Sequence, residues 1–495
     1  MSQRSIPRTQ QNSIEPEIEP LTLPPSSVEP IPPSRPVQPS APPELRPGSN
    51  PLLFPTSPAE VSPELVQPIT LQQAVDLALE SSQELEIARL SLQRSQQALQ
   101  EALAGQFPTI DLSADISRLD SAGTELQLER ANAAALQTFG STGSSISDTL
   151  TGQIELNYNV YSGGRIASQI KAARRQSRVS ELNLEQVSED IRFQTTQLYY
   201  QLQNADAQET IARAAVEDSA QTLRDAQLLE QAGLGTRFDV LRGEVELANA
   251  NQDLTQALAN QRIARRELAE VINVSQEVIL AAADEIAEAG TWDLGLEESI
   301  VKAFKNRAEL EQFLLEREIN EQQRQIALAD VRPQVTVFAN YNLRNELDDS
   351  VTGFGDGYAF GAQLNWRIFD GGSARAQARQ SETDILIDEQ EFANERDQIR
   401  LEVETAYFNL QANQENIQTS EKAVTLAEES LRLARLRFQA GVGTQTDVIN
   451  SQTELTNARA NFLDAIISYN LSLNELQRSV SNYPEGILFD LPDRP

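Results

Sequence analysis

Two runs of 68 residues each, 165–232 and 373–440, contain neither glycine nor proline. Both runs are rich in Ala, Leu, Gln, Glu and Arg, residue types that favour the helix. At ~1.5 Å per residue, a helix of this length would extend for ~100 Å. A chain of 495 residues would otherwise suggest about three globular domains. The two runs instead predict an elongated, mainly α protein.

Both runs carry a seven-residue repeat of small and apolar side chains, which is typical of coiled-coil packing. In the first run the repeat comprises Leu184, Ile191, Leu198, Ala205, Ala212, Ser219 and Ala226. In the second run it comprises Phe392, Ile399, Ala406, Asn413, Ser420, Ala427 and Ala434. The heptads alone would favour an ordinary long coiled coil.

The chain is an internal duplication. Pro108 recurs as Pro333, an offset of 225, and the Gly233–Thr236 motif recurs at 441–444, an offset of 208. We therefore expect two repeats, 70–290 and 291–483, each with a helix, two strands, a long helix, a glycine turn and a final helix. The expected segments after the strands are 165–232, 233–237 and 238–284 in the first repeat, and 373–440, 441–445 and 446–482 in the second.

The segments outside the repeats have a different composition. Residues 1–69 hold 18 of the 23 prolines, so we expect a Pro-rich, disordered arm there. Residues 484–495 form a short C-terminal tail. The start of the chain has neither the basic nor the apolar region of a signal peptide. If the protein is exported, we expect its signal peptide to be absent from this numbering.

Strict alternation of apolar and polar residues marks four segments between the helices. The predicted strands are 109–118 and 152–161 in the first repeat, and 334–343 and 358–369 in the second. Each is about as long as a tilted strand needs to be to cross a bilayer. Four strands cannot close a barrel, but three copies of the chain would supply twelve. The alternative is a soluble coiled-coil scaffold on which the strands form a small packed sheet.

Several chemistries are excluded by composition. The chain has no cysteine and no histidine, which removes thiol nucleophiles and the commonest general base and zinc ligand. The formal charge of −33 argues against a nucleic-acid partner. No stretch reaches ~18 consecutive apolar residues, so we expect no transmembrane helix. We therefore expect no enzyme activity, no cofactor and no metal.

Two duplicated motifs carry a resemblance to a known family. A strand passes through paired glycines into a long helix at 160–165 (Val-Tyr-Ser-Gly-Gly-Arg) and again at 368–372 (Ile-Phe-Asp-Gly-Gly). A Gly-x-Gly-Thr turn with Asp three residues later follows each long helix. In these features residues 70–483 resemble the TolC family of outer-membrane efflux proteins.

The resemblance implies a fold that is mainly α with membrane β: a trimeric, 12-stranded outer-membrane barrel continued by a 12-helix α-barrel. It implies a homotrimer in outer-membrane lipid of a Gram-negative-type envelope, extending into the periplasm. Such a protein is the exit duct of drug efflux or type I secretion. Its implied partners are a periplasmic adaptor (membrane fusion) protein and an inner-membrane RND or ABC transporter, which exports small molecules, drugs or proteins.

The resemblance also implies three groups of site residues. The adaptor would contact the tip at Ala232, Gly233, Leu234, Gly235, Ala440, Gly441, Val442 and Gly443. The pore would narrow at Asp447, Asn450, Asp239, Thr236 and Thr444. The strand–helix junctions would turn at Gly163, Gly164, Gly371 and Gly372. On residue chemistry alone, the tip glycines could simply end helices, and the two aspartates could simply favour helix N-termini.

Some family members close the tip with a Tyr and an Arg that tie neighbouring helical hairpins together. The corresponding positions here look like Phe438 and Gly443, which cannot make those bonds. Arg237 or Gln445 could substitute for them. The sequence thus leaves the closing contacts open.

Overall fold

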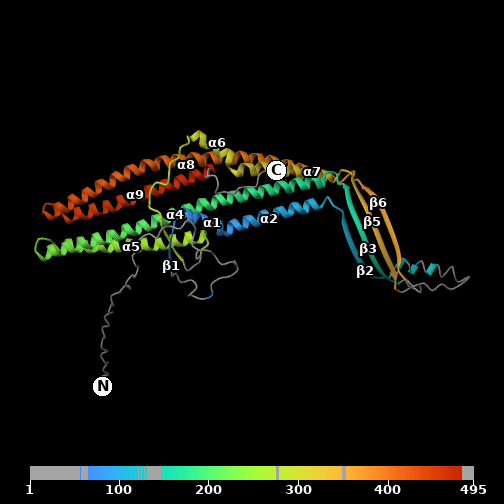
Figure 1. Ribbon diagram of the computed structural model, residues 1–495, viewed down its shortest axis with the longest axis horizontal. Coiled ribbons are helices and arrows are strands. Elements are labelled where there is room, and N and C mark those ends of the chain that lie inside the picture. The colour runs from blue at the N-terminus through green and yellow to red at the C-terminus, as the bar shows by residue number, and fades with distance from the viewer. Residues whose placement is uncertain are drawn as a thin grey trace, which may run out of the picture. The chain divides into compact units, whose positions relative to one another are not determined.

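A computed structural model describes residues 65–120, 146–274, 278–347 and 353–481, together with Thr56 and six residues between 122 and 130 (Figure 1). The chain divides into two units, Met1–Ser40 and Ala41–Pro495, and every described residue belongs to the second. The expected tail 484–495 and most of the expected arm 1–69 lie outside the described residues.

β1 (Leu65–Ile69) precedes the first repeat, which contains α1 (Leu71–Ser81), α2 (Gln83–Ala104), β2 (Thr109–Asp120), β3 (Ile146–Tyr161), α4 (Arg165–Gln231), α5 (Arg237–Val271) and β4 (Val278–Ala282). The second contains α6 (Leu296–Asn306), α7 (Ala308–Ala329), β5 (Gln334–Glu346), β6 (Gly355–Asn365), α8 (Ser373–Gln439) and α9 (Gln445–Val480). α1 and α2 match α6 and α7 at the offset of 225, and α4 matches α8 at 208, with equal lengths in each pair.

Several expected elements differ from the structure. The strand expected over 152–161 begins at Ile146, and the strand expected over 358–369 is Gly355–Asn365. The helix expected over 238–284 ends at Val271, because Asn273 adopts a left-handed conformation (φ 49°) and donates from its side chain to the Ser81 carbonyl at 3.0 Å. The residues expected to continue it form β4, which pairs in parallel with β1. The last five residues of the expected disordered arm are therefore a strand, in which Ile69 is fully buried.

The first helix of each repeat is also divided. α1 gives way to α2 at Ser82, and α6 gives way to α7 at Arg307; both residues have extended backbones. The Ser82 hydroxyl accepts from the Leu85 N–H and so begins the new helix as an N-cap. The breaks set α1 and α6 apart from the long helices that run toward the sheet (Figure 1).

The helices form a layer whose order follows from their contacts. α4 packs against α2, α7, α5 and α9, whereas α8 packs against α7, α9 and the short α6. α4 with α5 and α8 with α9 form two long antiparallel hairpins that end together, away from the sheet (Figure 1). The expected heptad positions face these contacts, and Ile191, Ala226, Ile399 and Ala406 are all buried.

A buried ionic cluster joins four helices at the place where α7 begins and α9 ends. The Arg478 guanidinium donates to Glu189 at 3.2 Å, Asp190 at 2.7 Å and Glu309 at 3.1 Å. Arg307 donates to Glu309 at 2.9 Å and also to Glu402 at 2.8 Å. Burial raises the pKa of Glu189 to about 7, and the attraction of Arg478 offsets only part of this rise. The cluster ties α4, α7, α8 and α9 together.

The sheet has the order β2-β3-β5-β6, and all its pairs are antiparallel. Its register places apolar residues of all four strands side by side on one face. The rows across that face are Ile110, Leu156, Ala339 and Phe360, and then Leu112, Ile154, Tyr341 and Tyr358. Most of these side chains are exposed, with Leu112 at 77%, Tyr358 at 78% and Phe360 at 79%.

The other face of the sheet is polar, as the alternation predicts. Glu155 accepts there from the side chains of Gln153 and Asn157 at 3.1 and 3.0 Å. Phe338, which breaks the alternation, lies on this face over Gly361, where an added Cβ would come within 3.1 Å of its ring. In the described part of the chain, β2 and β6 are the sheet's edges, and each has one side without a partner strand.

No helix among the described residues is both long and apolar enough to cross a membrane.

Candidate functional site

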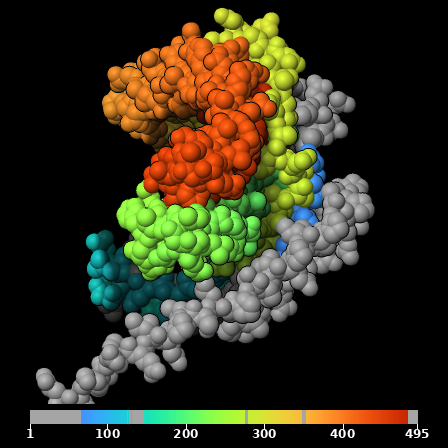
Figure 2. Space-filling view, turned by 90° about the vertical axis from the view of Figure 1, so that its left-hand side faces the viewer, coloured from blue at the N-terminus to red at the C-terminus, as the bar shows by residue number. Residues whose placement is uncertain are grey.

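The candidate site is the end of the two helical hairpins, where each long helix turns back (Figure 2). Both turns have nearly the same backbone. Gly233 has φ 71° and Gly441 has φ 72°, a left-handed conformation that favours glycine. An added Cβ at either position would meet open space. The first glycine of each motif is therefore needed for its conformation and not for packing.

The second glycine of each motif is needed for a different reason. A Cβ at Gly235 would lie 3.0 Å from the Leu229 Cβ, and one at Gly443 would lie 3.0 Å from the Arg437 Cβ. These glycines let the chain close against the last turn of the preceding helix, where the N–H groups of both residue 235 and residue 443 donate to carbonyls at 3.0 Å. The Gly-x-Gly spacing thus combines one conformational and one steric requirement.

The residues after the glycines begin the returning helices. Thr236 and Thr444 are N-caps, and each exchanges hydrogen bonds with the Asp three residues on in a capping box. The Asp447 carboxylate accepts from the Thr444 N–H at 3.0 Å, and hydrogen bonds from Thr444 lower the pKa of Asp447. Both aspartates therefore have the helix-capping role that residue chemistry alone allows, and Asp447 keeps its charge at neutral pH.

The surface of the tip is apolar at its extremity. Leu234 and Val442, the middle residues of the two turns, are 80% and 70% exposed. Phe238 and Leu241 extend this exposed surface along the first turn of α5. Asn450 and Asp447 are also exposed, one turn apart on α9. The structure thus presents the predicted contact residues at the ends of both hairpins.

At the tip, the contact between the two hairpins uses Gln445 together with Arg242, Gly243 and Thr446, which the sequence did not single out. In Figure 2, atoms of α9 (red) lie against atoms of the first hairpin (green). The Arg242 guanidinium of α5 donates to the Thr446 hydroxyl of α9 at 2.7 Å. Beside it Gly243 approaches Gln445, and a Cβ at Gly243 would lie 3.3 Å from the Gln445 amide nitrogen. The lone glycine inside a helical pattern was the available signal for this close approach.

The residues considered as substitutes for closing contacts have other surroundings. Arg237 lies 3.8 Å from Glu230 across its own turn. Gln445 is buried, and within the described part of the chain its amide has no hydrogen-bond partner. Phe438 packs with Val448 and Leu455 in a small apolar cluster. Bonds between the hairpins are made by Arg242 with Thr446, and further from the tip by Arg435 with Asp218 at 2.8 Å.

The strand–helix junctions contain the four predicted glycines, all with positive φ between 66° and 94°. At the first junction, Arg332 donates to the Gly163 carbonyl at 3.1 Å, and Arg165 pairs with Asp330. At the second junction, the Asp370 carboxylate accepts from the N–H groups of Gly372 and Ala374 at 2.8 and 2.7 Å. The paired glycines turn the chain from strand to helix at both places.

A sheet with one apolar face, joined by glycine turns to two long helical hairpins, defines the architecture of an outer-membrane channel subunit. The family model for outer membrane efflux proteins matches residues 74–274 and 299–482. The chain belongs to the outer membrane efflux protein family. The resemblance drawn from the repeated motifs is confirmed. No curated protein sequence matches the chain.

Solved structures show the same fold. The outer membrane protein VceC from Vibrio cholerae is 20% identical, with a TM-score of 0.69 over 83% of this chain and 95% of that one. The CmeC outer membrane channel of Campylobacter jejuni is 15% identical, with a TM-score of 0.70 over 83% and 85%. The open-state MtrE outer membrane channel of Neisseria gonorrhoeae is 18% identical, with a TM-score of 0.65 over 83% and 88%.

Proposed function

We propose that the protein is the outer-membrane exit duct of a tripartite export system. Three copies form a 12-stranded barrel in the outer membrane, continued by a 12-helix α-barrel in the periplasm. A periplasmic adaptor joins the duct to an inner-membrane RND or ABC transporter, which supplies the energy. The exported substrates are small molecules and drugs, and also proteins or other secreted substrates.

The observation that carries this proposal is the sheet. Its apolar face exposes Ile110, Leu112 and Phe360 as a continuous surface, which a water-soluble monomer rarely presents. Its two edges carry backbone groups that lipid cannot satisfy, so a single copy could not enter a bilayer. Pairing β6 of one copy with β2 of the next satisfies these edges, and three copies reach the size at which a barrel closes.

The soluble scaffold is not favoured by the same observation. A scaffold would need its sheet packed against helices, whereas Leu112 and Phe360 are more than three-quarters exposed. The polar face is the one suited to water, because Gln153, Glu155 and Asn157 interact on it. This arrangement fits a barrel with lipid outside and water inside.

Electron microscopy of detergent-extracted protein tests the proposal. Helices of ~100 Å and a barrel spanning ~30 Å should give threefold tubes roughly 130–140 Å long. Light scattering in detergent should give the mass of three chains. Thin rods or compact particles that stay in solution without detergent would support the scaffold and overturn the duct.

We assign the adaptor contact to the tip turns. Leu234 and Val442 offer small apolar surfaces at the ends of the hairpins, and the open space around Gly441 lets a partner approach the backbone. Replacing Gly441 by Arg should abolish export and leave trimers intact. Gly441→Asn is the control for backbone strain, because Asn tolerates the left-handed conformation. Export by the Arg variant at the level of the Asn variant would overturn the assignment.

We assign the pore constriction to the same end. Three Asp447 carboxylates around a threefold axis, with Asn450 one turn further on and Asp239 on the neighbouring hairpin, would favour cations over anions. The lowered pKa of Asp447 keeps this ring charged. In planar bilayers, Asn450→Asp should raise cation selectivity and Asp447→Asn should reduce it. Equal selectivity in both variants would place the constriction elsewhere.

A further inference from the structure

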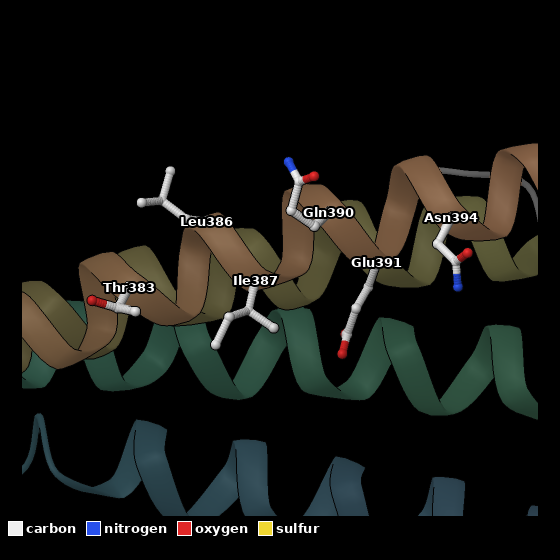
Figure 3. Close-up of a pocket in the computed structure, with 6 residues that line it drawn as sticks. All are labelled: Thr383, Leu386, Ile387, Gln390, Glu391 and Asn394. Carbon is white, nitrogen blue, oxygen red and sulfur yellow. The ribbon is translucent and has the colours of Figure 1, made fainter.

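A hollow of about 740 Å³ lies where α1, α2, α4 and the end of α5 meet, a volume that suits a small ligand. We call it the α2–α5 hollow. Its polar lining includes the Ser82 hydroxyl, the Gln194 amide and the carboxylates of Glu84 and Glu270. The hollow on α8 is of a different kind, because all its lining residues come from one helix and Glu391 is its single charged residue (Figure 3). Of these two hollows, the α2–α5 hollow is the one in which polar groups from several elements converge.

The internal duplication gives the α2–α5 hollow an equivalent place in the second repeat. The offset of 225 carries Ser82 onto Arg307, and the offset of 208 carries Glu270 onto Arg478. These arginines are the two cations of the buried ionic cluster. In the first repeat one of them is replaced by a short hydroxyl side chain and the other by a carboxylate. The hollow therefore lies where the second repeat has two guanidinium groups.

The acceptors that surround Arg307 are retained in the first repeat. The Arg307 guanidinium donates to Glu309 at 2.9 Å and to Glu402 at 2.8 Å. It also donates to the Ser479 carbonyl at 3.5 Å. The equivalents of these acceptors all line the α2–α5 hollow: Glu84, Gln194 and Val271. A carboxylate, an amide oxygen and a backbone carbonyl can each accept a hydrogen bond, so the hollow keeps a set of acceptors for a guanidinium.

Glu270 strengthens the preference of this hollow for a cation. It lies next to the last residue of α5, where the backbone carbonyls give the helix end a partial negative charge and an acidic side chain is unfavourable. The second repeat has Arg478 in the last turn of α9. Arg266, one turn before Glu270, also lines the hollow, but the carboxylates of Glu84 and Glu270 outnumber it. A cation bound from outside the chain would compensate both the carboxylates and the helix end.

An organic cation fits the hollow better than a metal ion does. Within the described parts of the chain, no group of three or more acidic side chains is placed to hold a metal. The acceptors of the hollow come from three helices, α2, α4 and α5. A guanidinium is planar and carries five N–H donors, so it can meet acceptors that approach from several directions.

We propose that the α2–α5 hollow binds a guanidinium cation in the position that the Arg307 side chain has in the second repeat. The carboxylates of Glu84 and Glu270 accept hydrogen bonds from it, and the Gln194 amide oxygen and the Val271 carbonyl accept its remaining N–H groups. The cation belongs to a small guanidinium compound or to an arginine side chain of a bound protein, since both present the same planar set of donors. This site is separate from the export of substrates and does not depend on the proposed trimer.

Ligand-observed NMR on the full chain in detergent tests the site. Saturation-transfer difference spectra are recorded with Nα-acetyl-argininamide and with Nα-acetyl-citrullinamide, in which a neutral urea of nearly the same shape replaces the guanidinium. We expect a signal from the arginine probe and at least about 5-fold less from the citrulline probe, because the latter has no charge for the carboxylates to attract. Equal signals from the two probes would overturn the proposal.

Variants of the lining locate the binding. Glu84→Gln and Glu270→Gln should each weaken binding of the arginine probe about 5-fold, the upper range for an exposed charge pair. Glu86→Gln is the matched control, because the Glu86 side chain lies on the same helix, is 58% exposed and does not line the hollow. Ser82→Arg introduces the equivalent of Arg307 and should abolish binding by occupying the site. Probe binding that persists unchanged in Ser82→Arg, or in both Gln variants, would contradict the proposal.

Methylguanidinium distinguishes the two sources of the cation. Equal affinities for methylguanidinium and Nα-acetyl-argininamide would support a free guanidinium compound as the ligand. Binding of the arginine probe that is tighter by about 10-fold or more, or about 1.4 kcal/mol, would support an arginine side chain of a bound protein. Either result supports the site.

The outcomes separate this inference from the proposed function. Circular dichroism and light scattering should give the same helical content and the same mass for every variant. If the protein forms trimers but neither guanidinium probe binds, the site is wrong and the duct survives. If the arginine probe binds with the expected dependence on Glu84 and Glu270 but no trimer exists, the duct is wrong and the site survives.

Discussion

The two repeats share a backbone and differ in what surrounds it. Leu182 of α4 is buried beneath its neighbours, whereas its equivalent on α8, Gln390, is exposed. A Cβ added at Gly163 would lie 2.9 Å from the Arg332 Cβ, but at the equivalent Gly371 it would meet nothing. Duplication preserved the helices and turns, while the side chains diverged according to whether a position meets its own chain. If the proposed trimer forms, the exposed apolar side chains of the second repeat are those that we expect another copy to cover.

Among equivalent positions, Arg478 and Glu270 should differ most in how much free energy of unfolding is lost on substitution. Arg478→Leu leaves Glu189 and Glu309 buried without their shared cation, which should lower the free energy of unfolding by about 3–5 kcal/mol. Glu270→Leu, at the lining of the α2–α5 hollow, should cost less than about 1 kcal/mol. Denaturant titration followed by the helical circular dichroism signal measures both.

If the two variants lost a similar free energy of unfolding, the contrast between Arg478 and Glu270 would be contradicted. Such losses would mean that Glu270 has a buried role like that of Arg478, although one residue lies in the ionic cluster and the other lines a hollow. Restoring a cation with Arg478→Lys should recover only part of the loss, because a single ammonium cannot reach three carboxylates as a guanidinium does.

Sequence predicted those features of the fold that depend on local rules. The absence of glycine and proline predicted α4 and α8 within one residue at the C-terminal end, and alternation placed all four strands of the large sheet. The sequence did not predict β1 and β4, because each strand of a short parallel pair depends on a partner more than 200 residues away. The breaks at Ser82 and Arg307 were missed because neither glycine nor proline marks them in the sequence.

The candidate site was predictable to a similar extent. Local spacing identifies the glycines and capping residues of the tip, and both turns have the geometry that the motif requires. The Arg242–Thr446 hydrogen bond could not be predicted, because the partners come from different hairpins and neither residue type is distinctive. Sequence thus located the turns, whereas the hydrogen bonds between the hairpins could be seen only in the packed structure.

The pH dependence of the free energy of unfolding should distinguish Glu189 from its equivalent Asp397. The pKa of Glu189 is raised from 4.5 to about 7 by burial, against the attraction of Arg478 and with repulsion from Glu185 and Glu309. The folded chain therefore holds this proton more tightly than the unfolded chain. The free energy of unfolding should fall as pH rises from about 4.5 to about 7. Glu189→Gln should flatten the fall.

The control for this titration is Asp397→Asn, because the Asp397 side chain is 71% exposed. Its variant should keep the slope of the parent protein. Unfolding midpoints measured at several pH values between 4.5 and 7.5 decide the matter. A slope that persists unchanged in Glu189→Gln would assign the titration to another member of the cluster.

The two tip turns have matching backbones, so equivalent substitutions in them should lower the free energy of unfolding by similar amounts. Gly235→Ala and Gly443→Ala both force a Cβ to within 3.0 Å of the preceding helix. Each should lower the free energy of unfolding by about 1–2 kcal/mol, the usual cost of modest overpacking. The difference between the two variants should be smaller than either loss. A large loss at only one turn would show that the hairpins have unequal packing at the tip, contrary to their matching backbones.

The smallest effect is expected from giving α4 the side chain that α8 has at the equivalent position. Arg178→Leu introduces on α4 the residue that α8 has at Leu386, and it removes the contact with Glu311. Both partners of that ion pair are partly exposed, at 29% and 48%, so its loss should cost only about 0.2–1 kcal/mol. The parent protein should lose a little stability between low and high salt, and the variant should lose less. A loss of several kcal/mol would mean that the ion pair fixes the register of α4 against α7. The two repeats would then differ at this position because packing against α7 requires an arginine, and not because either side chain is tolerated there.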